Sequence, residues 1–164
     1  MNRHIKYALM TILLLIIQTA GMRLVTIEGI TPDILALWII VIALNEGQMP
    51  ATMWGFSIGL VFDLISGNFL GLSALTKTVC GFIAGYFYNE NKTRLSIGSY
   101  RFLLIVLVTC FIQNLVYFFI YTRGSDISVL SAVFRYGTTT ALYTAAFSLF
   151  LVFIYSRRSP LEHV

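Results

Sequence analysis

The sequence has 164 residues, of which 58% are hydrophobic and only 11% are charged, and its mean hydropathy is +0.84. A water-soluble domain carries about a quarter charged residues, so this chain has too few charges to cover a surface that faces water. We expect lipid to cover most of it. The formal charge of +4 does not indicate nucleic-acid binding, because the basic residues stand singly between apolar runs, where such residues usually set membrane orientation.

Six apolar segments predict an all-α, polytopic membrane protein with a single domain over residues 1–164. They lie at about 5–24, 32–47, 50–66, 70–88, 100–122 and 128–155. A helix needs about 20 residues to span a bilayer, and the first, fourth, fifth and sixth segments meet this length. The second and third are shorter, which predicts either short helices or a re-entrant hairpin. The first segment resembles a signal peptide, but the apolar segments after it favour a retained helix.

Turn residues mark the segment boundaries. Thr31-Pro32 predicts an N-cap followed by a first-turn proline, and Pro50 opens the third segment in the same way. The polar turn at 45–48 separates the second segment from the third, and we expect its Glu46 to be solvated. Ser66 and Gly67 predict a tight hairpin turn into the fourth segment, with Gly71 just beyond it.

The basic residues predict the orientation of the chain. With the N-terminus in the cytoplasm, most of them fall on the cytoplasmic side, which is the distribution that membrane proteins favour. These cytoplasmic residues are Arg3, Lys6, Lys92, Arg94, Arg101, Arg157 and Arg158, while Arg23 and Arg123 lie outside and Arg135 lies deeper. We therefore expect an even number of crossings and two cytoplasmic termini, with either six spans or four spans and a re-entrant pair.

Glycines recur at four-residue spacing in the third and fourth segments. Gly55, Gly59 and Asp63 share one face of a helix, because a step of four residues advances only about 40° beyond a full turn. Gly81 and Gly85 repeat the spacing in the fourth segment. Such glycines let two helix backbones approach closely. We expect them to pack helices within the chain, and docking of a partner's transmembrane helix is the alternative.

Polar residues inside apolar segments are costly and usually have a task. We expect Asp63 to bind backbone amides near Gly67 and so to hold the hairpin together; a role in a cavity or at a partner surface is the alternative. Lys77 is the candidate counter-charge for Asp63, or else it extends to the membrane interface. Asp33 fits a helix cap.

Three further polar residues lie in the last two segments. We expect Gln113 and Asn114 to bond across helices, and Arg135 to pair with Asp126 or to reach outward. Together with the other intramembrane polar residues, they are candidates to line an internal pocket.

The residue types that build active sites are sparse. His4 and His163 lie near the chain ends, and Cys80 and Cys110 fall inside apolar runs, where we expect them to pack helices. No two carboxylates have an acid–base spacing, and no Ser-His or Cys-His pair lies in an apolar segment. We expect no enzymatic activity, no cofactor and no metal.

The stretch from Pro32-Asp33 through Gly55-x3-Gly59-x3-Asp63-x3-Gly67-x2-Leu70-Gly71 to about Gly85 resembles the rod shape-determining protein MreD family of bacteria. The resemblance implies a non-enzymatic subunit of the cell-wall elongation (rod) complex in the cytoplasmic membrane, with a role in cell-shape maintenance. It also implies association with MreC, a protein with one transmembrane helix. Through the complex, the resemblance also implies links to MreB, to RodA and to a class B penicillin-binding protein, and so to peptidoglycan synthesis.

MreD-like proteins are also similar to the six-helix substrate-binding subunits of energy-coupling-factor transporters. The alternative function is therefore a vitamin-type substrate-binding subunit. Those subunits carry two alanines four residues apart on their first helix. In this chain Ala8 is followed by Ile12, and Ala20 by Leu24, so this docking feature is missing.

Overall fold

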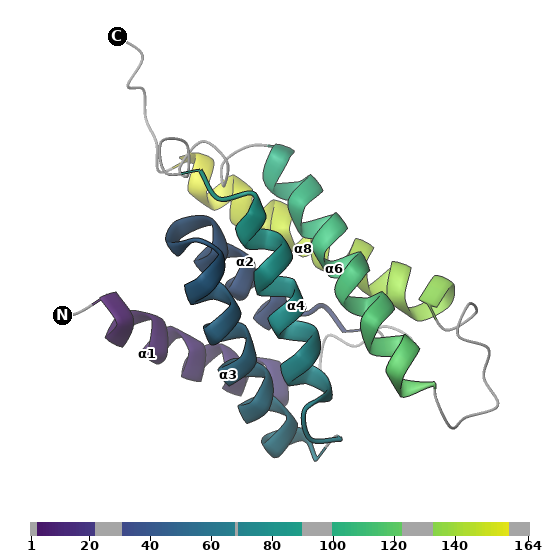
Figure 1. Ribbon diagram of the computed structural model, residues 1–164. Helices are drawn as coiled ribbons and strands as arrows, with labels where there is room; N and C mark the ends of the chain where they lie inside the picture. Colours follow the sequence, from purple (N-terminus) through teal and green to yellow (C-terminus); the bar gives the residue numbers. More distant parts are fainter. Residues whose placement is uncertain (1–2, 22–30, 68, 90–99, 123–132, 158–164) are drawn as a thin grey trace, which may run out of the picture.

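The computed structural model describes residues 3–21, 31–67, 69–89, 100–122 and 133–157 (Figure 1). Its six α-helices are α1 (Arg3–Ile16), α2 (Ile34–Glu46), α3 (Gln48–Ser66), α4 (Leu72–Tyr86), α6 (Tyr100–Tyr121) and α8 (Thr138–Arg157). A π-helical turn, η1 (Ile17–Gly21), continues α1, and another, η3 (Val133–Gly137), leads into α8. In this part of the chain no strand occurs, so the all-α class and the six predicted helical segments are confirmed.

The lengths of the third and fourth helices correct the prediction. The third segment was expected to be short, yet α3 has 19 residues, and it begins before Pro50 because a proline in the first turn removes no intrahelical hydrogen bond. The fourth was expected to be long, yet α4 has 15 residues. It starts only after a connection in which Gly67 and Gly71 have positive φ angles. Among the described helices, α3 and α6 combine the length and apolar character of a membrane span.

The start of α2 also differs from the prediction. The N-cap is Asp33 rather than Thr31, and the Asp33 carboxylate accepts a hydrogen bond from the backbone N–H of Ala36 at 2.9 Å. Pro32 precedes the cap and is not a first-turn residue. The position of the cap matters because the Asp33 side chain there also reaches other helices.

The short helix α2 lies at the centre of the bundle. It contacts α1, α3, α4, α6 and α8, and residues such as Leu35, Ile39 and Ile42 are completely buried. Its 13 residues extend about 20 Å, less than the roughly 30 Å thickness of a bilayer's hydrocarbon core. Because other helices surround α2, its apolar side chains pack against protein on all sides.

The helices α3 and α4 form an antiparallel hairpin and make the most extensive contact between any two described elements (Figure 1). A Cβ atom added at Gly59 would lie 2.5 Å from the Cα of Ala74, and one added at Gly81 would lie 2.5 Å from the carbonyl oxygen of Ala51. No real Cβ tolerates such distances. The hairpin is therefore packed backbone against backbone through its glycines.

The remaining helices cover the other sides of α2. The helices α6 and α8 run alongside each other (Figure 1), and α1 reaches the core through aromatic contacts. The Tyr7 ring packs edge-on against Trp38 at 5.8 Å and against Trp54 at 6.3 Å between ring centroids. The Tyr7 hydroxyl also donates to Glu46 at 2.9 Å. Glu46 is therefore half-buried and bonded to α1, where only solvation had been expected.

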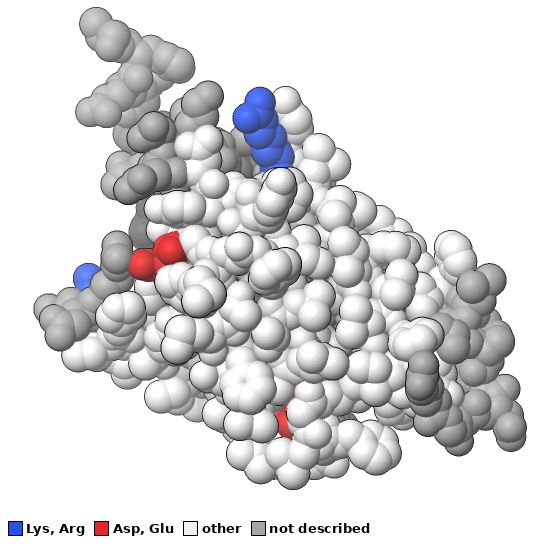
Figure 2. Space-filling view, viewed as in Figure 1, with Lys and Arg blue, Asp and Glu red and all other residues white. Residues whose placement is uncertain are grey.

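Few of the described residues on the outer surface are charged. Figure 2 shows one face on which few Lys, Arg, Asp or Glu side chains are visible. Large apolar side chains are exposed on the outward faces of several helices, among them Leu9, Met53, Phe82, Leu104 and Leu142. Extensive exposed apolar surface is typical of proteins that contact a membrane or a partner.

Candidate functional site

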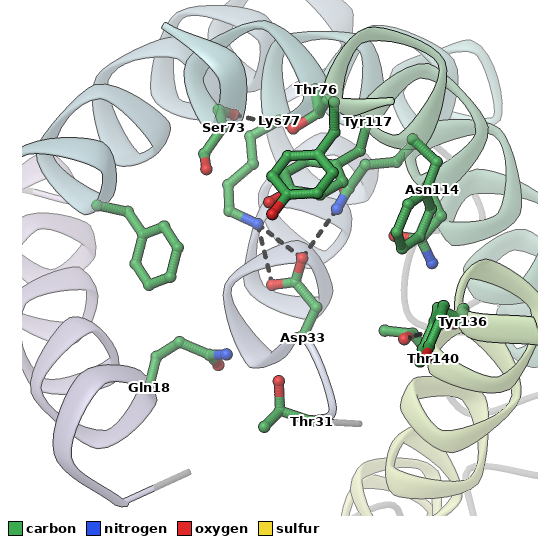
Figure 3. Close-up of a pocket in the computed structure, with 14 residues that line it drawn as sticks. Gln18, Thr31, Asp33, Ser73, Thr76, Lys77, Asn114, Tyr117, Tyr136 and Thr140 are labelled. Atoms are coloured by element: carbon green, nitrogen blue, oxygen red, sulfur yellow. Dashed lines mark hydrogen bonds and ion pairs between the residues drawn. The ribbon is translucent and has the colours of Figure 1, made fainter. Parts of the chain in front are cut away.

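A buried ion pair joins the start of α2 to the middle of α4. The Lys77 ammonium lies 3.0 and 2.7 Å from the two carboxylate oxygens of Asp33 (Figure 3). The Lys77 side chain is 4% exposed and that of Asp33 20%. Gln113 of α6 donates a third hydrogen bond to the same carboxylate at 2.8 Å. Three helices thus meet at one carboxylate.

Side chains of two further elements hold the backbone next to Asp33. The Asp33 N–H donates to the Thr144 hydroxyl of α8 at 3.0 Å. Gln18 of η1 accepts from the N–H of Ile34 at 3.1 Å and donates to the carbonyl of Pro32 at 3.3 Å. The first N–H groups of a helix have no partner within it, and here side chains distant in sequence supply the partners.

A cavity of about 420 Å³ lies beside this ion pair. Figure 3 shows side chains from η1, the start of α2, α4, α6, η3 and α8 around it. Its lining residues are Gln18, Thr31, Asp33, Phe62, Ser73, Thr76, Lys77, Gln113, Asn114, Tyr117, Phe118, Tyr121, Tyr136 and Thr140. The volume falls in the range of small-molecule sites, and such sites usually combine apolar walls with a few convergent polar groups.

Asp63 has a separate role at the α3–α4 connection. Its carboxylate accepts from the backbone N–H groups of Gly71 at 2.9 Å, Ser73 at 3.0 Å and Ala74 at 3.3 Å. The carboxylate therefore caps the first turn of α4, where unpaired N–H groups and the helix dipole favour a negative charge. Asp63 is buried but does not line the cavity.

A comparison with protein-family models identifies the relatives of this chain. The model of the rod shape-determining protein MreD matches residues 1–157, nearly the whole sequence. The chain belongs to the MreD family. No curated protein and no solved structure matches it.

Membership of the MreD family defines the broad role of the chain. MreD proteins are membrane proteins that determine rod shape as components of the rod complex, and the family is not known for enzymatic activity. Among the described residues, no group of three or more His, Cys, Asp or Glu side chains could hold a metal ion. The match of the family model confirms the resemblance drawn from the glycine and aspartate pattern.

In this MreD-family chain, the structure gives Lys77 a different partner from the one expected. Lys77 pairs with Asp33, not with Asp63, because Asp63 already accepts backbone N–H groups at the start of α4. Asp33 therefore caps α2 and also binds Lys77, and capping alone had been expected. The sequence signal that could have revealed the pair is the presence of two opposite charges in the second and fourth apolar segments.

The other candidate residues fall into separate places. Gln113 and Asn114 both bond across elements, the latter to the carbonyl oxygen of Gly137 at 2.9 Å, and both line the cavity. The glycines Gly55, Gly59, Gly81 and Gly85 are buried in the α3–α4 contact. Ser66 ends α3, Gly67 is its C-cap and Gly71 is the N-cap of α4. The side chain of Arg135, and Asp126, lie outside the described residues.

Several cavity residues were not singled out from the sequence. Gln18, Tyr117 and Tyr136 come from three separate elements. Aromatic residues and single amides are common in apolar helices, so nothing in their local sequence marks them. They come together only because Gln18 bonds the start of α2, α6 packs against α2 and α4, and η3 packs against α6.

Proposed function

We propose that this chain is a multi-pass subunit of the bacterial cytoplasmic membrane that docks the transmembrane helix of MreC and, through MreC, joins MreB, RodA and a class B penicillin-binding protein. The observation that carries the proposal is the match of the MreD family model along residues 1–157. The structure supports it through the exposed apolar side chains of its described helices, because a helix docking from lipid needs an apolar face. We propose no catalytic step for the chain.

The proposed topology has six spans and both termini in the cytoplasm. On this arrangement the α2–α3 connection at Gly47 faces the cytoplasm and the α3–α4 connection at Gly67 faces outward. The exposed Lys6 and Arg101 then lie on the cytoplasmic side, as membrane proteins favour. The cavity beside Asp33 lies toward the outer side, because α2 starts there.

The docking surface for MreC must lie away from the glycines. Gly55, Gly59, Gly81 and Gly85 already contact the neighbouring backbone in the α3–α4 hairpin, so a partner helix cannot approach them. The exposed apolar faces of α1, α3, α6 and α8 remain available. This moves the expected contact from the glycine faces to the outward faces of the bundle.

Site-specific photo-crosslinking in cells tests the docking proposal. A photoreactive amino acid is placed at exposed Leu9, Met53, Leu104 or Leu142, with buried Ile40 as the matched control. We expect at least one exposed position to form a covalent adduct with tagged MreC and Ile40 to form none. The absence of adducts at every exposed position, with normal abundance of both proteins, would contradict docking through the membrane helices.

A second candidate function is substrate binding for an energy-coupling-factor transporter. The cavity of about 420 Å³ is the observation that favours it. The missing alanine pair on the first helix weighs against it, since Ile12 and Leu24 stand at the second positions. Co-purification with a transporter ATPase rather than with MreC would support this second function.

A further inference from the structure

The cavity contains a buried hydrogen-bond acceptor that the protein leaves without a donor. The Gln113 side chain is 4% exposed, and its Oε1 accepts no hydrogen bond from the described residues. The amide cannot be flipped to remove the problem, because its nitrogen donates to Asp33 at 2.8 Å and a flipped oxygen would face that carboxylate. An unsatisfied buried acceptor costs about 1–3 kcal/mol. Such an atom in the wall of a cavity suits a ligand that donates.

The charges in the cavity wall cancel. Asp33 and Lys77 are the charged residues among those that line it, and each neutralises the other at 2.7 Å. Gln113 takes up part of the remaining acceptor capacity of the Asp33 carboxylate. Among the described residues of this wall, a ligand with a net charge would find no opposite charge that is not already paired, and burying it would be costly. The wall therefore favours an uncharged ligand.

Aromatic rings form the apolar part of the wall. Tyr117 and Tyr121 stack with their ring centroids 5.7 Å apart and their planes 12° apart. Phe118, Tyr136 and Phe62 add further rings around the same space, which Tyr117 also lines (Figure 3). Aromatic faces pack well against flat rings.

We propose that this cavity binds an uncharged, ring-containing molecule that donates an N–H or O–H hydrogen bond to Gln113 Oε1 and packs its ring against Tyr117. A heteroaromatic carboxamide and a sugar share this chemistry. The sugar could be free or could be the headgroup of a lipid. This site is separate from the proposed docking of MreC, since none of the exposed apolar positions chosen to test docking lines it, and its occupation does not depend on that function.

The test is thermal unfolding of the full chain in mild detergent with two matched pairs of probes. The first pair is nicotinamide and nicotinate, and the second is methyl β-glucoside and glucuronate; within each pair only one member is uncharged. We expect at least one uncharged probe, near its solubility limit, to raise the melting temperature by about 2–4 °C. Its charged counterpart should leave the melting temperature unchanged.

Two variants and one control tie the shift to the cavity. Gln113→Leu removes the acceptor and should abolish the shift, while Tyr117→Leu keeps the ion pair and should reduce it. The control is Thr109→Val, because the Thr109 hydroxyl is also buried and unpartnered but does not line the cavity. It should keep the full shift. Tyr117→Leu provides the test if Gln113→Leu does not fold.

Three results would overturn the proposal. They are no shift with either uncharged probe, as for a cavity filled by water alone; an equal shift in wild type and both cavity variants; and an equal shift with a charged counterpart. If methyl β-glucoside is the probe that binds, adding a glucosyl diacylglycerol to the micelle distinguishes the two sources. A larger shift with the lipid indicates a headgroup, and a smaller one indicates a free sugar.

Discussion

At the scale of single residues, the Asp33 side chain connects three helices. It caps α2 through Ala36, pairs with Lys77 and accepts from Gln113. A buried ion pair contributes little net stability compared with apolar packing, but removing one partner leaves a buried, uncompensated charge. The pair should therefore respond very differently to single and double substitution.

Replacing Lys77 with methionine should destabilise the protein by about 3–5 kcal/mol, because the Asp33 carboxylate would lose its counter-charge. The double variant Lys77→Met/Asp33→Asn should recover most of this loss, since asparagine is also a good helix cap. The measurement is the free energy of unfolding in mixed micelles. Lys6→Met is the control, because Lys6 is exposed. A single variant as stable as wild type would show that the pair contributes nothing.

At the scale of helices, hydropathy was sufficient to predict six segments, because a continuous apolar run has few alternatives to a buried or lipid-facing helix. The boundaries of α3 and α4 were not predictable in the same way. They depend on the carboxylate of Asp63 binding the N–H groups of Ser73 and Ala74. A contact between residues 10 or 11 positions apart leaves no periodic signal in the sequence.

The cavity was even harder to predict from the sequence. Lys77 and Asp33 are separated by 44 positions and Gln113 and Asp33 by 80. Their meeting depends on how α4 and α6 pack against α2. The sequence pointed to Gln113 and Asn114 as polar residues that bond across helices, but it could not identify their partners.

The α3–α4 hairpin offers a test of packing by glycine. Gly59→Ala should lower the free energy of unfolding by about 1–3 kcal/mol, because the new methyl group would overlap the backbone at Ala74. Gly137→Ala is the control, since a Cβ there would meet its nearest neighbour at 3.4 Å, an ordinary contact distance. Equal stability of the two variants would show that the hairpin can separate at little cost. Chemical denaturation of the purified variants provides the comparison.

At the scale of the whole molecule, the membrane arrangement can be tested with single cysteines. In a background with Cys80 and Cys110 changed to alanine, Ser66→Cys should react with a membrane-impermeant maleimide in intact spheroplasts. Asn45→Cys should react only after the membrane is opened. Both positions are exposed on the protein surface. If Asn45→Cys stays unreactive even in opened membranes, the result would instead indicate that α2 and α3 form a re-entrant pair.

The central position of α2 has a consequence for how the protein is made. Its polar start is secured by Gln18, which is synthesised earlier, and by Lys77, Gln113 and Thr144, which are synthesised later. Until α8 has left the ribosome, the N–H of Asp33 lacks its hydroxyl partner and part of the α2 surface lies uncovered. We therefore expect chains that end before α8 to be recognised by membrane proteases, and the bundle to close only once translation is complete.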